Sequence, residues 1–203
     1  MEKEYGKTEM WYIVDCEPDS YLYYGLNCTV SKDEFRKRIE NNTLLEILNK
    51  VPVHKGDVFF IPSGTIHAIC AGILICEIQQ NSNTNYREYD YDRRGADGKP
   101  RELHIDKAVE TSNLCPAPAQ KAAEGNVLAS CKYFTAEKVV CDGTASAAAD
   151  KGCFRSFVVL EGSGTLEING AKIDICKGDS VFIPAQDGEI IFSGTLEGVL
   201  SYV

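Results

Sequence analysis

The stretch that decides the fold runs from Lys55 to Arg93 and reads KGDVFFIPSGTIHAICAGILICEIQQNSNTNYREYDYDR. It opens with a Gly56-Asp57 turn, continues as a short apolar run with the composition of a strand, and turns again at Pro62 to Gly64. The second turn delivers His67 to the start of another strand. A strand, a Pro/Gly corner and an inward-pointing His together indicate a small β-barrel that presents an imidazole to a metal ion.

The second half of this stretch turns polar. Read as a strand, residues 72–79 send alternate side chains to one face, which changes from apolar Ile73 to polar Glu77 and Gln79. Turn-forming residues follow, and Arg87 comes directly after them. Because a guanidinium stays charged and can bind phosphate or carboxylate with two donors, Arg87 is a candidate for binding an anionic oxygen.

Composition narrows the class of protein. The chain has 203 residues, a net charge of -9 and a pI of about 4.9, which argues against nucleic acid or an anionic membrane as its partner and leaves a small anion open. Its nine cysteines are odd in number and form no C-x-x-C pair, so we expect a reducing, cytoplasmic protein without disulfides. The N-terminus lacks an apolar signal core, and no stretch reaches transmembrane length.

A carboxylate heads the first strand. Residues 9–14 have strand composition, and Glu9 precedes five apolar residues, with Lys7 on the same side if the strand extends that far. One interpretation is that Glu9 is a solvated strand end, as isolated charges usually are. The other is that Glu9 and Lys7 belong to a site.

Helical signals are few. Ser31 and Glu34 form a capping box, which predicts a short helical insertion over about residues 31–50. A second short helix is expected from His104, and we expect both His54 and His104 to lie on the surface. Residues 113–127, rich in Pro and Ala, form the candidate linker, and a β pattern follows them.

One internal repeat sets the architecture. KGDVFFIP at 55–62 recurs as KGDSVFIP at 177–184, but only the first copy is followed by a His. We therefore predict an all-β fold of two jelly-roll barrels. Residues 1–112 would form a central barrel with the metal site, and 128–203 a smaller, degenerate barrel without one.

Two motifs carry a family resemblance. Gly-Asp-x4-Pro-x-Gly-x-x-His, from Gly56 to His67, resembles the second conserved motif of the cupin superfamily. The longer string from Pro62 to Arg93, with GKTEMWY at 6–12, resembles the bacterial type I mannose-6-phosphate isomerases, and the resemblance continues more weakly to the last residue.

The resemblance implies a zinc-dependent aldose–ketose isomerase that interconverts mannose 6-phosphate and fructose 6-phosphate. The family holds zinc (Zn2+) with a Gln-x-His pair, a Glu and a His, and the last two match Glu9 and His67. Arg87 matches the family's catalytic Arg, and Lys7 the lysine beside its metal-binding Glu, so both are expected to serve catalysis and substrate binding. No Gln-x-His occurs upstream of Glu9, and we therefore expect the family's N-terminal portion to be absent.

Two other hypotheses stay open. The chain could be a non-catalytic cupin that binds a sugar phosphate without metal, or an assembly domain whose polar run over residues 86–94 is only surface. An absent N-terminal portion would also leave an open sheet edge and an apolar patch on the first barrel, which would allow a homodimer through that edge.

Overall fold

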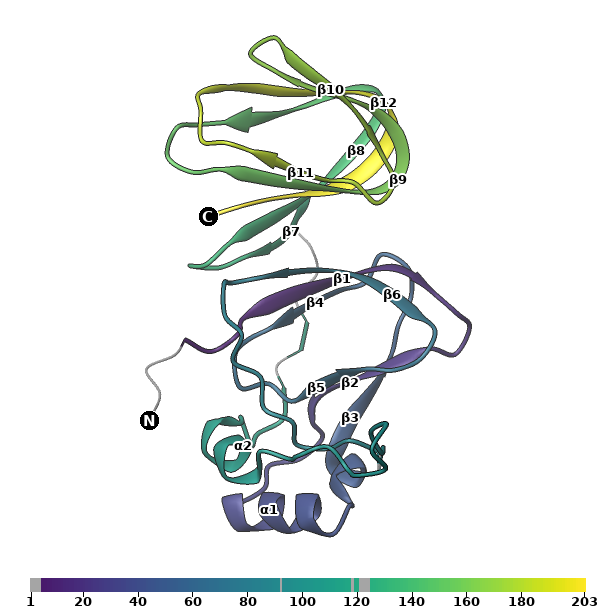
Figure 1. Ribbon diagram of the computed structural model, residues 1–203, viewed down its shortest axis with the longest axis vertical. Helices are drawn as coiled ribbons and strands as arrows, with labels where there is room; N and C mark the ends of the chain where they lie inside the picture. Colours follow the sequence, from purple (N-terminus) through teal and green to yellow (C-terminus); the bar gives the residue numbers. More distant parts are fainter. Residues whose placement is uncertain (1–4, 92, 118, 121–124) are drawn as a thin grey trace.

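The computed structural model describes residues 5–91, 93–117, 119–120 and 125–203. Two antiparallel β-barrels lie end to end, and two helices cover the far side of the first barrel (Figure 1). The prediction of an all-β chain with two barrels and a short helical insertion is confirmed. The candidate linker 113–127 falls partly on residues 118 and 121–124, which lie outside the described residues.

The first barrel consists of two three-stranded sheets. One has the order β4-β1-β6, from β4 (Val58–Ile61), β1 (Glu9–Cys16) and β6 (Ile73–Gln79). The other has the order β3-β2-β5, from β3 (Leu48–Pro52), β2 (Tyr21–Leu26) and β5 (His67–Ile69). Apolar side chains of both sheets meet inside the barrel around Trp11, Leu22 and Ile61.

Strand β1 is buried on both faces, which explains its continuous apolar sequence. Trp11 and Ile13 point into the first barrel, and the alternate residues Met10 and Tyr12 pack against the second barrel. Glu9 shares the inward face, so its carboxylate is placed inside the barrel by the strand period alone.

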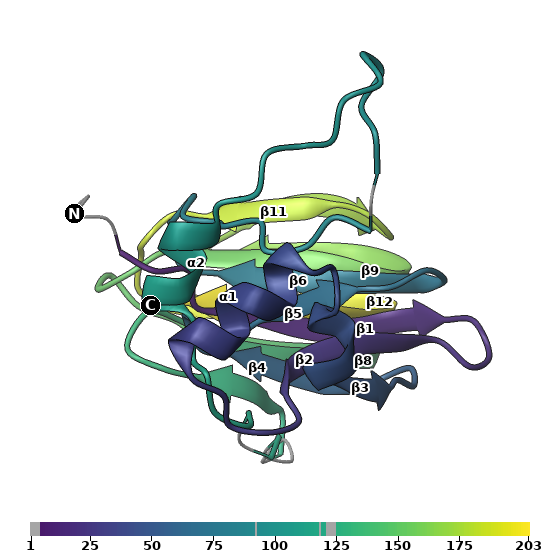
Figure 2. The ribbon, with the colours of Figure 1, turned by 90° about the horizontal axis from the view of Figure 1, so that it is seen from below.

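The helices pack on the outer face of the β3-β2-β5 sheet, as Figure 2 shows from below. Helix α1 (Lys32–Glu40) starts at Ser31, whose hydroxyl accepts the Glu34 amide at 3.1 Å. A 3-10 turn, η1 (Leu44–Ile47), follows, and α2 (Ile105–Thr111) lies beside α1. The expected end of the insertion near residue 50 is wrong, because residues from Leu48 onward pair with β2 as strand β3.

The second barrel is a single sheet with the order β10-β9-β12-β8-β7, and β11 also pairs with β9. Its strands are β7 (Val127–Ser130), β8 (Thr135–Ala149), β9 (Arg155–Ile168), β10 (Ala171–Cys176), β11 (Ser180–Ile183) and β12 (Gly188–Tyr202). Phe157 and Phe192 are fully buried in its core, with ring centroids 4.6 Å apart.

The sequence repeat is also a structural repeat. Gly56 and Gly178 both have a φ of 93°, a value that favours glycine. In the first turn the Asp57 carboxylate accepts the His54 amide at 2.7 Å, and in the second Asp179 accepts the Cys176 amide at 2.8 Å. The duplicated Gly-Asp therefore serves the same purpose twice, since each pair closes the turn that leads into a strand, β4 or β11.

The two barrels share a packed interface. Met10, Phe60 and Cys76 of the first barrel meet Phe134 and Val199 of the second in one apolar cluster. At its edge the Tyr12 hydroxyl donates to Glu197 at 2.9 Å, and Lys138 reaches both groups at 2.9 and 3.0 Å. The barrels thus bury part of each other's surface.

The remaining structural expectations concern thiols, membranes and the open edge. All nine cysteines are free. No described helix is long and apolar enough to cross a membrane. Among the described residues β6 is an edge strand of its sheet, and its Leu74 is 53% exposed. At the opposite edge, the Phe60 amide of β4 donates a hydrogen bond to the Gln120 side chain at 2.8 Å. A homodimer through this sheet stays a prediction.

Candidate active site

Glu9 is the most deeply buried charged residue of the site. It begins β1, lies opposite Ile61 and Gln79 in the neighbouring strands, and is 0% exposed. Its Oε2 accepts from Lys7 Nζ at 2.7 Å and from Trp11 Nε1 at 3.1 Å. The interpretation of Glu9 as a solvated strand end is therefore wrong, and Lys7 lies on the same side of the chain as expected.

His67 meets Glu9 across the barrel. It begins β5 in the facing sheet, and its Nε2 lies 3.2 Å from Glu9 Oε1. Its Nδ1 lies 2.7 Å from the Thr65 carbonyl oxygen and therefore carries a proton, because a carbonyl only accepts. The Trp11 and His67 rings pack at nearly a right angle, with centroids 5.0 Å apart. The two sequence-predicted metal ligands are thus brought together.

The contact between these two residues requires a positive charge. With Nδ1 protonated, neutral His67 directs a lone pair at Oε1, and Oε1 is buried without a hydrogen-bond partner among the described residues. Two facing acceptors repel each other unless a proton or a metal ion lies between them. Imidazole held through Nδ1 by a carbonyl, with a carboxylate at its other nitrogen, is an arrangement that suits zinc. The two residues therefore fit a metal ion.

The surroundings keep Glu9 ionised. Burial acts to raise the pKa of Glu9, but the close contacts of His67 and of the Lys7 ammonium with its oxygens outweigh burial and lower the pKa to about 2. Burial likewise acts to lower the pKa of Lys7, but its hydrogen bonds to Glu77 and Glu9 raise the pKa overall. A carboxylate and an ammonium therefore coexist at the site.

Glu77 joins this cluster from β6. Its Oε1 accepts from Lys7 at 2.6 Å, and its Oε2 accepts from Trp11 Nε1 at 3.0 Å. The sequence places Glu77 on the polar end of a strand face but does not identify it as a site residue. The missing information is strand register, because Glu77 lies opposite Trp11 in the β1–β6 ladder.

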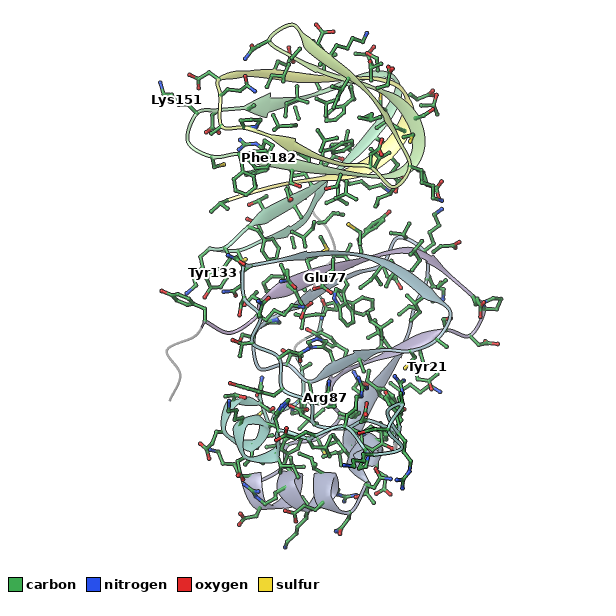
Figure 3. All side chains as sticks on the ribbon, in the orientation of Figure 1. Tyr21, Glu77, Arg87, Tyr133, Lys151 and Phe182 are labelled. Atoms are coloured by element: carbon green, nitrogen blue, oxygen red, sulfur yellow. The ribbon has the colours of Figure 1, made fainter. Side chains whose placement is uncertain are left out.

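Lys7, Glu9 and His67 line a cavity of about 930 Å³ between the first barrel and the helices. Arg87 lines the same cavity, and its guanidinium donates to the Glu102 carbonyl at 3.1 Å. Figure 3 shows Glu77 at the sheet of the barrel and Arg87 closer to the helices. All four predicted site residues, Lys7, Glu9, His67 and Arg87, therefore line one cavity.

The two other histidines differ in position. His54 is 80% exposed, as expected, in the turn before β4. The expectation for His104 is wrong, because it is half-buried and lines the cavity. Its ring nitrogen Nδ1 accepts a hydrogen bond from the Arg87 backbone amide at 3.0 Å, a contact that sequence spacing could not reveal.

A second carboxyl, half-buried, lines the cavity and was not foreseen. Glu88 accepts from the Ser112 hydroxyl at 2.7 Å, and burial raises its pKa. Among the described residues no group of three or more His, Cys, Asp or Glu side chains is arranged to hold a metal. Glu9 and His67 are therefore the two ligands that this part of the chain offers.

The fold and the site define a two-barrel cupin protein whose first barrel borders a cavity lined in part by charged side chains. Residues 124–203 match the family model described as "Mannose-6-phosphate isomerase, cupin domain". The chain is 39% identical over 208 residues to the mannose-6-phosphate isomerase ManA of Bacillus subtilis, covering 98% of this chain and 65% of the relative. It is 35% identical to the mannose-6-phosphate isomerase of Streptococcus mutans, covering 99% of this chain and 65% of the relative.

A solved structure agrees. The mannose 6-phosphate isomerase of Bacillus subtilis superposes with a TM-score of 0.88 at 35% identity, covering 100% of this chain and 66% of that one. A mannose 6-phosphate isomerase bound with zinc and yttrium, at 14% identity and a TM-score of 0.68, shares the fold. The chain belongs to the mannose-6-phosphate isomerase family, and it spans about 65% of the length of these curated relatives.

Proposed function

We propose that this chain carries the zinc site and active-site cavity of an isomerase that interconverts mannose 6-phosphate and fructose 6-phosphate. One observation carries the proposal: Glu9 Oε1 and His67 Nε2 lie 3.2 Å apart, and Oε1 accepts no hydrogen bond from the described residues. Lys7 and Arg87 line the same cavity. Relatives named as mannose-6-phosphate isomerases support the choice of reaction and substrate.

The residues suit proton transfer between adjacent carbons of a sugar. This reaction passes through an enediolate, and a zinc ion, when bound by Glu9 and His67, would supply a Lewis acid for the developing negative charge. Lys7 adds an ammonium beside the same oxygens, and its pairing with Glu9 and Glu77 favours the charged form. Arg87 offers two donors for an anionic oxygen of the substrate.

The first test measures metal and turnover together. Purified protein is analysed for zinc by mass spectrometry and assayed with mannose 6-phosphate in a coupled assay, alone and with any polypeptide that supplies further ligands. His67→Ala and Glu9→Gln should each remove stoichiometric zinc and turnover, whereas the matched control His54→Ala should leave both intact. Zinc retained by both site variants would refute the proposed ligands.

A second candidate is a cupin that binds sugar phosphate without metal or catalysis. It is favoured by the finding that only two ligating side chains meet among the described residues, because catalytic zinc sites normally use three protein ligands. This function predicts that mannose 6-phosphate raises the melting temperature in the presence of a chelator, and that Arg87→Ala abolishes the increase. An unchanged melting temperature of the wild type under these conditions would eliminate it.

We also propose the domain limits that the repeat suggests: a central barrel over 1–112, a linker over 113–127 and a second barrel over 128–203. Strand β7 begins at Val127 and the family match at residue 124, which support a boundary in this region. Nine free thiols support a cytoplasmic location. Limited proteolysis that cuts first between residues 113 and 127 would support the limits, and a first cut within a barrel would contradict them.

A further inference from the structure

Two cysteines that are distant in the sequence lie in segments that contact each other through their backbones. Cys28 lies in the bend that follows β2 and precedes α1, and Cys115 lies in the segment that follows α2. Both side chains are exposed, and both thiols are free. The described residues that line the cavity include neither of them, so this pair is separate from the proposed metal site.

The contacts between the two segments lie on both sides of this pair. The Val30 amide donates to the Leu114 carbonyl at 3.0 Å. That carbonyl belongs to the peptide unit that Leu114 shares with Cys115, so one hydrogen bond and one intervening residue separate the two cysteines. Before the bend, Leu26 forms an isolated parallel β-bridge with Pro116. The backbone contacts therefore place the two cysteines next to each other.

The surrounding packing fixes how the two segments lie. A Cβ at Gly25 would lie 2.3 Å from the Ala117 Cβ, so the backbones approach there as closely as a glycine allows. The Cys115 amide donates to the Asn113 side chain at 3.2 Å, and the Asn113 amide donates to the Gly64 carbonyl at 2.7 Å. Because Gly64 lines the cavity, the position of Cys115 is linked through Asn113 to the cavity wall.

We propose that Cys28 and Cys115 form a reversible disulfide when the protein meets a low-molecular-weight disulfide such as oxidised glutathione. One protein thiolate attacks the small disulfide, which gives a mixed disulfide and releases one small thiol, and the second cysteine then attacks the mixed disulfide and releases the other. The two protein thiols lose two electrons and two protons, and the small disulfide is reduced to two thiols. A disulfide joins Cα atoms roughly 4–7 Å apart, and Cys28 lies outside any helix or strand, so the bend can adjust without breaking a strand ladder.

The bond would fasten the chain that leaves α2 to the chain that enters α1. It would close a loop that contains both helices and strands β3 to β6 of the first barrel. Closing so long a loop restricts the unfolded chain and stabilises the folded one. In a reducing compartment such a bond is transient and reports the redox state, which agrees with the free thiols of the structure. This inference goes beyond the proposed function and does not depend on it.

The test counts thiols and measures stability in glutathione redox buffers. The full chain is equilibrated with oxidised glutathione, denatured, alkylated and weighed by intact mass spectrometry. The number of free thiols should fall by two from nine with no glutathione attached, and the melting temperature should rise by roughly 5–10 °C until dithiothreitol reverses both changes. Cys28→Ser and Cys115→Ser should each prevent both changes and retain glutathione on the remaining cysteine, because no second thiol resolves the mixed disulfide. The matched control Cys176→Ser removes an exposed thiol of β10 and should respond as the wild type does.

Three results would overturn the pair. They are an unchanged thiol count in the oxidised wild type, a loss of two thiols that persists in Cys115→Ser, and a covalent dimer on non-reducing electrophoresis in place of the internal bond. The readouts involve neither metal nor turnover. A chain that forms this disulfide without isomerase activity would therefore contradict only the proposed function, and an active chain that does not form it would contradict only the disulfide.

Discussion

Lys7→Met should destabilise the metal-free protein far more than removal of an exposed lysine. Lys7 pairs with Glu9 at 2.7 Å and with Glu77 at 2.6 Å, and the Glu9 side chain is 0% exposed. Without the ammonium, an ionised carboxylate remains in the barrel, and of the residues that the structure describes only Trp11 and His67 still contact it. Breaking a buried pair by removing one partner leaves an uncompensated charge, and this charge dominates the cost.

The magnitude follows from burial. A broken buried pair costs about 3–5 kcal/mol, and we expect the lower end because Lys7 is itself 21% exposed and His67 still faces Glu9. For a chain of this size each 1 kcal/mol shifts the melting temperature by about 2–4 °C, which gives a decrease of roughly 6–12 °C. The control Lys32→Met breaks a pair whose side chains are 54% and 60% exposed, and it should cost at most about 1 kcal/mol.

The assay is urea and thermal unfolding in a chelating buffer, because bound metal would add stability of its own. The double variant Lys7→Met/Glu9→Gln removes the stranded charge and should be less destabilised than the sum of the single variants by about 1–3 kcal/mol. Equal destabilisation by Lys7→Met and Lys32→Met, or strict additivity in the double variant, would refute the argument that Glu9 is ionised and dependent on Lys7.

Two further predictions use the repeat and the buried thiols. Phe60 and Phe182 occupy the same position of the repeated turn and strand. Phe60 packs against Phe134 with ring centroids 6.4 Å apart, whereas Phe182 is 65% exposed. In urea unfolding, Phe60→Ala should therefore lower the free energy of unfolding by about 2–3 kcal/mol and Phe182→Ala by less than about 0.5 kcal/mol. Burial raises the pKa of Cys76 from an ordinary 9.0 to about 11. The unfolded chain therefore loses this thiol proton first, and stability should fall by about 2 kcal/mol between pH 9 and pH 11. Cys76→Ala should lessen this fall when urea unfolding is compared at both pH values.

Sequence patterns predicted the barrels better than they predicted β8, one of the two longest strands. The repeated Lys-Gly-Asp turn indicated two related barrels because its chemistry is local: a glycine with positive φ and an aspartate that closes the turn. Strand β8 was not foreseen, since residues 141–149 are CDGTASAAA, with little β propensity. Its ladder with β12 runs from Thr135 to Ala149, and this tertiary pairing overrides the local preference.

The site was predictable where one motif contains the chemistry and unpredictable where distant segments meet. His67 and Arg87 lie in a continuous string that resembles a known family, and Glu9 and Lys7 in a second. Glu77 enters through strand register, and His104 through hydrogen bonds to a residue 17 positions earlier. Neither register nor such a loop contact leaves a periodic signal in the sequence.

The second barrel shows why one copy of the repeat could keep a cation site and the other could not. Glu9 lies opposite Ile61 in the first barrel, and Arg155 lies opposite Ile183, the repeat equivalent of Ile61, in the second. Both side chains are buried, and each has one buried polar atom without a hydrogen-bond partner among the described residues. Because a guanidinium is always charged, Arg155 places a fixed positive charge where the first barrel has a carboxylate. The same backbone position thus carries a carboxylate that would suit the proposed metal ion in the first barrel and a cation that would repel one in the second. The second copy of the repeat also lacks the His that follows the first, so the difference lies in side chains and not in the fold.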